Sequence, residues 1–244
     1  AQALIKKFPK EVILFNICGI CYLDLGEFNE SVASYKNALK LQPDCVEVHF
    51  NLGNSYQAMK AFESAITSYK QVLRINPSYE KAYFNLGIIY TDLGQPDLAI
   101  LNYKEALEIN PNYGEAYNNL GNIFKEKGML NEAAENYKKA LKSMPQYVEP
   151  HQSLGAVLAD LNKYTEAIEH YESVLKIKPE HVDIYFDLGR LYSSIQKYEM
   201  AIKCFKQLIY FRPDDIKARI NLGNSFFDFG LQSEAIKSYK QALK

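Results

Sequence analysis

The 244-residue sequence has few cysteines, no long apolar run and almost no net charge. Its formal net charge is −1, whereas a protein surface that binds nucleic acid is strongly basic. No run approaches the roughly 20 apolar residues that a membrane-spanning helix needs. The succession of basic, apolar and small residues that indicates a signal peptide is also missing from the start. We therefore expect a partner that is neither nucleic acid nor a membrane.

Four cysteines are present, and Cys18 and Cys21 have the C-x-x-C spacing of redox and metal sites. A zinc site would need two further ligands at suitable spacing, and neither Cys45 nor a nearby pair of histidines supplies them. A thioredoxin-like site would need a β-strand before the motif, and no strand pattern precedes it. We predict two small apolar residues on one helix, with no metal and no cofactor. Cysteines without such a site, Cys204 included, favour a reducing, cytoplasmic compartment.

Glycine and proline recur along the whole chain at intervals of 34 residues, which is typical of a repeat protein. The glycines are Gly19, Gly53, Gly87, Gly121, Gly155, Gly189 and Gly223. The prolines are Pro9, Pro43, Pro77, Pro111, Pro145, Pro179 and Pro213. Aromatic residues keep the same interval at Tyr35, Tyr69, Tyr103, Tyr137, Tyr171, Phe205 and Tyr239. Because these registers stay in phase without an insertion, they define one structural unit.

The unit from 80 to 113 shows what each repeat forms. Tyr83, Leu86 and Tyr90 lie at i, i+3 and i+7, which places them on one stripe of an α-helix. Gly94 then suits a left-handed C-terminal cap of this helix. A second stripe begins at Ala99 and stops before Pro111, the repeated proline of this unit. One pair of helices cannot bury its apolar face alone, so the pairs must stack.

The sequence thus predicts an all-α fold of stacked antiparallel helix pairs. The end of a preceding repeat helix is expected over residues 1–11. Repeats are expected over 12–45, 46–79, 80–113, 114–147, 148–181 and 182–215, with a shortened repeat over 216–244. Because the pattern starts and stops inside a repeat, we expect a fragment of a longer protein. Positions in each repeat are numbered below from its first residue.

Segments such as Y-F-N-L-G-I-I-Y and A-I-L-N-Y-K-E-A-L-E-I-N-P resemble the tetratricopeptide repeat (TPR). The resemblance covers seven consecutive repeats and implies a right-handed superhelical α-solenoid, with first helices lining a concave groove and second helices outside. Two kinds of position depart from the family pattern. The early aromatic residue is replaced by His49, His151 and Arg219, and the cap glycine by Lys60, Asn162 and Gln196.

Asparagines recur on the predicted groove side of the first helices. Position 6 holds Asn51, Asn85, Asn119 and Asn221, and position 9 holds Asn54, Asn122 and Asn224. An amide side chain both donates and accepts, so it can pair with the N–H and C=O of an extended peptide. The position 6 series resembles the asparagine ladder of O-linked N-acetylglucosamine transferases, but Ile17, Ser153 and Asp187 interrupt it. Peptide binding and local structural hydrogen bonding both remain open as its role.

Position 5 places Phe50, Phe84 and Phe186 on the same side of the first helices. Such rings are candidates for anchoring apolar side chains of a ligand. The alternative, which we favour, is packing against the first helix of the neighbouring repeat.

Acidic residues outnumber basic residues on the predicted groove side. Position 13 alone holds Asp24, Asp92, Glu126, Asp160 and Asp228. This excess favours a neutral or basic ligand. Co-chaperones of the family bind acidic tails through Lys and Asn at positions 5 and 9. Here Arg190 is the single basic residue at position 9, and position 5 has no lysine, so that mode is not expected.

Catalysis is not expected, because no H-E-x-x-H, G-x-S-x-G, Walker or G-x-G-x-x-G motif occurs. The sequence predicts a scaffold for protein–protein interaction that binds an extended, neutral or basic peptide in its groove. Two alternatives stay open. The chain is a substrate-recruiting arm of a larger glycosyltransferase or sulfotransferase, or it is a scaffold that self-associates through the open ends of the solenoid.

Overall fold

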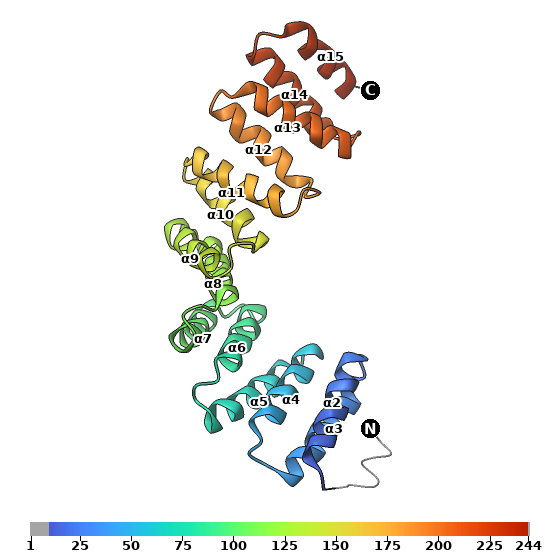
Figure 1. The fold of residues 1–244 in the computed structure, drawn as a ribbon, viewed down its shortest axis with the longest axis vertical. Helices are drawn as coiled ribbons and strands as arrows, with labels where there is room; N and C mark the ends of the chain where they lie inside the picture. The colour runs from blue at the N-terminus through green and yellow to red at the C-terminus, as the bar shows by residue number, and fades with distance from the viewer. Residues whose placement is uncertain (1–9, 244) are drawn as a thin grey trace. The chain divides into compact units, whose positions relative to one another are not determined.

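The computed structural model describes residues 10–243, which form fourteen α-helices and no β-strand (Figure 1). The helices of the first half are α2 (Val12–Asp24), α3 (Phe28–Leu41), α4 (Val46–Ala58), α5 (Phe62–Ile75), α6 (Glu80–Asp92) and α7 (Pro96–Ile109). Those that follow are α8 (Gly114–Glu126), α9 (Leu130–Ser143), α10 (Val148–Asp160), α11 (Tyr164–Ile177), α12 (Asp183–Ser194), α13 (Tyr198–Phe211), α14 (Ile216–Asp228) and α15 (Gln232–Ala242).

Two compact units make up the chain, one over Ala1–Ala116 and one over Tyr117–Lys244. Within each unit the two helices of a pair pack against each other, and the second helix contacts the first helix of the next pair. Figure 1 shows these pairs following one another along the chain. The predicted all-α fold of stacked helix pairs is therefore confirmed. The helix end predicted over 1–11 falls mostly outside the described residues.

The repeated glycine of each first helix makes room for an aromatic ring. A Cβ added at Gly53 would lie 2.6 Å from Cε1 of Tyr69, and one added at Gly121 would lie 2.6 Å from Cε1 of Tyr137. Both tyrosines are fully buried. The ring at position 24 of the same repeat therefore occupies the space that a side chain at this glycine would need.

Left-handed residues end the first helices, as the cap pattern predicts. Gly94 and Gly230 have φ values of 66° and 86°, and Lys60 and Gln196 keep the same conformation at 56° and 60°. Asn162, at 59°, tolerates it better because asparagine visits this region more readily. Lys60 and Gln196 therefore adopt a left-handed backbone conformation that is unfavourable for residues with a Cβ atom.

We expect Lys60→Gly to raise the free energy of unfolding by about 1 kcal/mol, because it removes the left-handed penalty of a residue with a Cβ. Urea unfolding followed by circular dichroism measures the change. Lys70→Gly is the matched control: Lys70 lies inside α5, where glycine should cost about 1 kcal/mol. Equal effects of the two substitutions would contradict this account.

Side chains at position 4 reach back to the loop that precedes their helix. Nε2 of His49 lies 2.7 Å from the carbonyl oxygen of Pro43, and Nη2 of Arg219 donates to that of Pro213 at 2.6 Å. These residues stand where the family pattern has an aromatic residue. Their hydrogen bonds satisfy a carbonyl that follows the end of the preceding helix, so the departures preserve the junction between repeats.

His151 occupies the same position on α10 and also pairs with a second histidine. Its Nε2 lies 3.0 Å from the carbonyl oxygen of Pro145, and its Nδ1 lies 3.0 Å from Nδ1 of His170 on α11. A carbonyl only accepts, so Nε2 of His151 carries the proton. In neutral His151 the Nδ1 atom must then accept from His170. Burial and the neighbouring His151 lower the pKa of His170 to about 4.

Among residues 10–243, no helix combines the length and apolar character needed to cross a membrane. The same residues contain no group of three or more His, Cys, Asp or Glu side chains placed to hold a metal ion. All four cysteines are free thiols. Cys18 is buried, as an apolar packing residue should be, but Cys21 is exposed. Both lie on α2, as the prediction of two small residues on one helix requires, and they differ in burial.

Candidate binding surface of the first helices

Asparagines at positions 6 and 9 form hydrogen bonds with the buried tyrosine at position 24. In the first unit, Tyr69 of α5 donates from its hydroxyl group to Oδ1 of Asn54 at 2.7 Å. Nδ2 of Asn85, on the next first helix, donates to the same Oδ1 at 3.1 Å and to the Tyr69 hydroxyl at 3.0 Å. These three side chains join α4, α5 and α6, so they set how one repeat stacks on the next.

Two neighbouring first helices are also joined through Asn51. Its Nδ2 donates to Oδ1 of Asn16 on α2 at 3.0 Å. Asn16 occupies position 5, so this bond lies on the face that sequence reasoning assigned to a ligand. The amide of Asn51 therefore has a structural role within the first unit.

The second unit repeats the tyrosine–asparagine pair twice. Tyr137 donates to Oδ1 of Asn122 at 2.7 Å, and Tyr239 donates to Oδ1 of Asn224 at 2.7 Å. Asn221 differs, because its Nδ2 donates to the backbone oxygen of Lys217 within α14 at 2.8 Å. Asn119 is half-buried on α8. Local hydrogen bonding thus accounts for part of the asparagine series.

Half of each amide remains available for a ligand at several of these positions. Among the described residues, no protein group pairs with Nδ2 of Asn54, Asn122 or Asn224. The same is true of the side-chain oxygens of Asn51, Asn85 and Asn221. The two roles left open by the sequence are therefore compatible, and peptide binding at the asparagines stays a prediction.

Two phenylalanines at position 5 contact tyrosines of their own repeat. The ring centroid of Phe50 lies 5.7 Å from that of Tyr69 and 5.1 Å from that of Tyr79. Phe84 contacts Tyr103 and Tyr113 in the same way, at 5.8 and 4.6 Å. These ring partners lie on the second helix and directly before the next first helix. Phe50 also packs against the buried cluster that contains Ala82 and Leu86 of α6, as the favoured packing on the neighbouring first helix predicts. Phe50 and Phe84 are half-buried, and their role as ligand anchors stays a prediction.

The tyrosine–asparagine pairing is interrupted between α10 and α12. Position 9 of α10 is Ala156, and position 6 of α12 is Asp187. A cavity of about 280 Å³ lies there, lined by Ala156, Ala159, Asp160, Tyr164, Tyr171, Asp187, Arg190, Leu191 and Ser194. Burial raises the pKa of Asp187, and Arg190 partly offsets this rise. Of the residues predicted for binding, Arg190 is the one that lines this cavity.

Sequence reasoning missed Ala156 and Tyr171 as residues of a site. Tyr171 was assigned to the core because its position is an aromatic core position in every repeat. Ala156 carried a signal, since it stands where three other repeats have asparagine. Where alanine replaces asparagine at position 9, the tyrosine at position 24 loses its hydrogen-bond partner and lines a cavity. The sequence does not show this consequence, because it depends on which side chains are neighbours in space.

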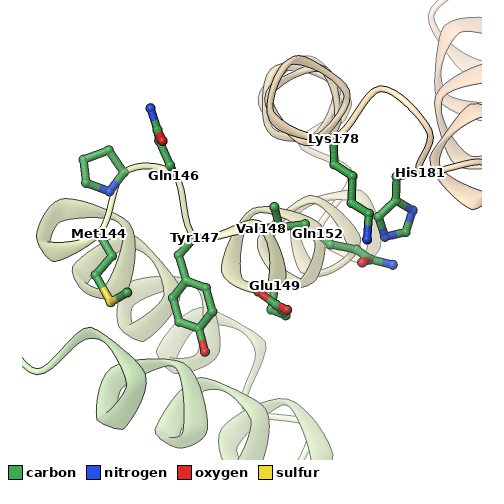
Figure 2. Close-up of a pocket in the computed structure, with 9 residues that line it drawn as sticks. Met144, Gln146, Tyr147, Val148, Glu149, Gln152, Lys178 and His181 are labelled. Atoms are coloured by element: carbon green, nitrogen blue, oxygen red, sulfur yellow. The ribbon is translucent and has the colours of Figure 1, made fainter.

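A second and larger cavity, of about 660 Å³, lies along the loops that precede α10 and α12. Figure 2 shows Lys178 and His181 side by side at one end of it, with Met144 and Tyr147 at the other. Glu149 and Gln152 come from the first turns of α10. Its lining mixes both signs of charge with neutral groups, and no single ligand chemistry is favoured.

Comparison with protein families covers most of the described helices. The family profile of the TPR repeat matches residues 21–60, 58–94, 87–128 and 121–162. A second profile, the tetratricopeptide repeat, matches residues 158–222. The chain belongs to the tetratricopeptide repeat family. The resemblance seen in the in-phase glycines, prolines and aromatic residues is thereby confirmed. No curated protein sequence matches this tetratricopeptide repeat chain.

Several solved structures share the fold. MamA is 28% identical with a TM-score of 0.63, and the match covers 67% of this chain and 90% of MamA. YrrB, described as a TPR protein with an unusual peptide-binding site, is 22% identical with a TM-score of 0.58 over 80% of this chain and 97% of YrrB. The C-terminal part of a TPR repeat-containing protein from Cytophaga hutchinsonii is 16% identical with a TM-score of 0.76, over 92% of this chain and 93% of that protein.

Proposed function

We propose that this tetratricopeptide repeat chain is a protein-interaction scaffold whose first helices bind an extended, neutral or basic peptide segment. The observation that carries the proposal is a row of asparagine amides whose oxygen accepts a hydrogen bond within the protein while the nitrogen has no protein partner. Nδ2 of Asn54, Asn122 and Asn224 has no protein partner among the described residues, while the oxygen of each side chain is held by a tyrosine. Each amide is therefore held in place while its donor remains available for a peptide carbonyl.

The charges near this row support a neutral or basic ligand. All the carboxylates at position 13 are exposed, namely Asp24, Asp92, Glu126, Asp160 and Asp228. Exposed acidic groups attract basic segments and disfavour acidic ones. YrrB shares the fold and is described as having a peptide-binding site, so the architecture is suited to this task.

The test distinguishes the effect of the asparagine amide on peptide binding from the effect of its structural hydrogen bond with tyrosine. The parent variant carries Tyr137→Phe and Tyr239→Phe, which remove the internal bonds and keep both asparagines. The test variant adds Asn122→Ala and Asn224→Ala. Removing both partners of a hydrogen bond leaves no buried polar group unpaired, so the second pair of changes should cost little stability.

Peptides selected by the wild-type chain from a displayed random dodecapeptide library serve as ligands, and fluorescence anisotropy gives their affinities. Losing two hydrogen bonds of about 1 kcal/mol each should weaken binding by the test variant about 30-fold relative to the parent variant. Equal affinities for the two variants, or a library from which no peptide is enriched, would show that the proposal is wrong.

A further inference from the structure

The cavity between α10 and α12 lies where a repeat has alanine at position 9, in place of the asparagine that three other repeats put beside their tyrosine. Tyr69, Tyr137 and Tyr239 each donate to a position 9 asparagine at 2.7 Å. Tyr171 is the equivalent residue of α11, and the residue at position 9 of its repeat is Ala156. The methyl group of alanine neither fills the space of an amide nor accepts a hydrogen bond. A cavity of about 280 Å³ results, and Tyr171 is part of its lining.

The hydroxyl group of Tyr171 has no hydrogen-bond partner among the described residues, although the side chain is only 4% exposed. Its ring is also held in place, because a Cβ at Gly155 would lie 2.9 Å from Cε1 of Tyr171. The hydroxyl group is not among the fully enclosed, unpaired polar atoms of the described residues, so it is accessible from the cavity. At the cavity wall it can therefore accept a hydrogen bond from a ligand group.

Two carboxylates face the same cavity. Asp187 is half-buried on α12, and no hydrogen bond or salt bridge joins its side chain to another described residue. Asp160 lies on α10 and is exposed at the cavity edge. Arg190 is the only basic side chain in the lining, so the acidic groups are in excess. A partly buried carboxylate is stabilised by a cation that also donates hydrogen bonds to it.

Size limits what the cavity can hold. Sites for drug-sized ligands occupy about 300–1,000 Å³, and this cavity is slightly smaller, at about 280 Å³. It therefore suits one side chain of a longer ligand. Its place among the position 6 and position 9 residues puts it on the proposed peptide-binding surface.

We propose that this cavity is a specificity pocket for one cationic side chain, lysine or arginine, of the bound peptide. The proposal rests on the function proposed above. The ammonium or guanidinium group donates to Asp187 and Asp160, and it also donates to the hydroxyl oxygen of Tyr171. Arg190 borders the pocket, and its charge partly offsets the rise that burial causes in the pKa of Asp187. The peptide backbone on either side of this residue lies along the asparagines.

Two variants remove the pocket in different ways. Ala156→Asn fills it with the asparagine found in other repeats and gives Tyr171 its partner. Asp187→Asn removes the half-buried charge and keeps the shape. Both should melt at the wild-type temperature or above it, since Ala156→Asn adds a hydrogen-bond partner for Tyr171 and Asp187→Asn removes a half-buried charge. Asp214→Asn, which removes one exposed negative charge from the loop before α14, is the matched control for net charge.

The probes are peptides enriched by the wild-type chain from the displayed dodecapeptide library. Each is synthesised in four forms, with lysine, arginine, norleucine or glutamate at its most enriched basic position. Wild type and Asp214→Asn should bind the lysine and arginine forms about tenfold more tightly than the norleucine form, and the glutamate form most weakly. Ala156→Asn and Asp187→Asn should lose that tenfold preference.

The outcomes separate the two proposals. Enrichment of peptides without a preferred basic position overturns the pocket and leaves groove binding standing. A lysine or arginine preference that survives in both pocket variants also overturns the pocket. If no peptide is enriched at all, the proposed function fails, and the pocket proposal fails with it.

Discussion

Replacing Gly53 by alanine should lower the free energy of unfolding by about 2 kcal/mol, although alanine favours a helix by about 1 kcal/mol over glycine. The new Cβ would lie 2.6 Å from Cε1 of Tyr69, a ring that is fully buried. The ring cannot move away, because Phe50 packs on it and its hydroxyl group pairs with Asn54. Overpacking must therefore shift α4 relative to α5.

Urea unfolding followed by circular dichroism gives the effect, and Gly155→Ala provides a graded comparison. At Gly155 the nearest ring atom of Tyr171 would lie 2.9 Å from the added Cβ, so the loss should be smaller. The hydroxyl group of Tyr171 also lacks the asparagine bond that fixes the ring in other repeats. A stability gain at Gly53 would contradict the steric role of this glycine.

Lowering the pH from 6.5 to 4 should remove about 3 kcal/mol of stability through His170 alone. The pKa of His170 falls from 6.5 to about 4 on folding because of burial first, and then because of His151 and Lys138. Between pH 6.5 and pH 4, His170 is protonated in the unfolded chain and remains neutral in the folded chain. The free energy of unfolding therefore decreases as the pH is lowered, and it levels off near pH 4.

The measurement is urea unfolding at pH 7, 5.5 and 4.5, for wild type and His170→Gln. Carboxylates titrate near the lower pH, so the quantity of interest is the difference between the two proteins. His170→Gln should be less sensitive to acid by up to about 3 kcal/mol. His181→Gln removes a histidine outside the pair and should behave as wild type. Parallel pH dependences for wild type and His170→Gln would show that the pair does not control acid stability.

The fold was largely predictable because the repeat gives every element several independent signals. Three series recur in phase at intervals of 34 residues: the glycine at position 8, the aromatic residue at position 24 and the proline that follows the second helix. A chance match in one repeat therefore cannot mislead the assignment, because the other repeats test it. The left-handed cap at Lys60 was also placed correctly, although lysine by itself does not indicate such a conformation. Its position relative to the glycine caps of other repeats was sufficient.

The binding surface was less predictable, because its chemistry depends on which side chains meet. Asn54 and Asn85 were recognised as polar residues of one face, but their shared bond with Tyr69 joins three helices. Phe50 and Phe84 lie on the predicted face of the helix, yet their rings turn toward the tyrosines of the same repeat. Periodicity assigns a residue to a face and leaves open the direction of its side chain.

The sequence by itself determined the architecture of this tetratricopeptide repeat chain, because helix periodicity and repeat length are local properties that the order of residues records. The sequence also shows where the asparagine row is broken, but tertiary structure alone decided how the asparagines are used and that a cavity lies at Ala156. Tyr171, Ala156 and Asp187 are distant in sequence and belong to three helices. Whether a polar atom is satisfied depends on its neighbours in space, and stacking of the repeats sets those neighbours.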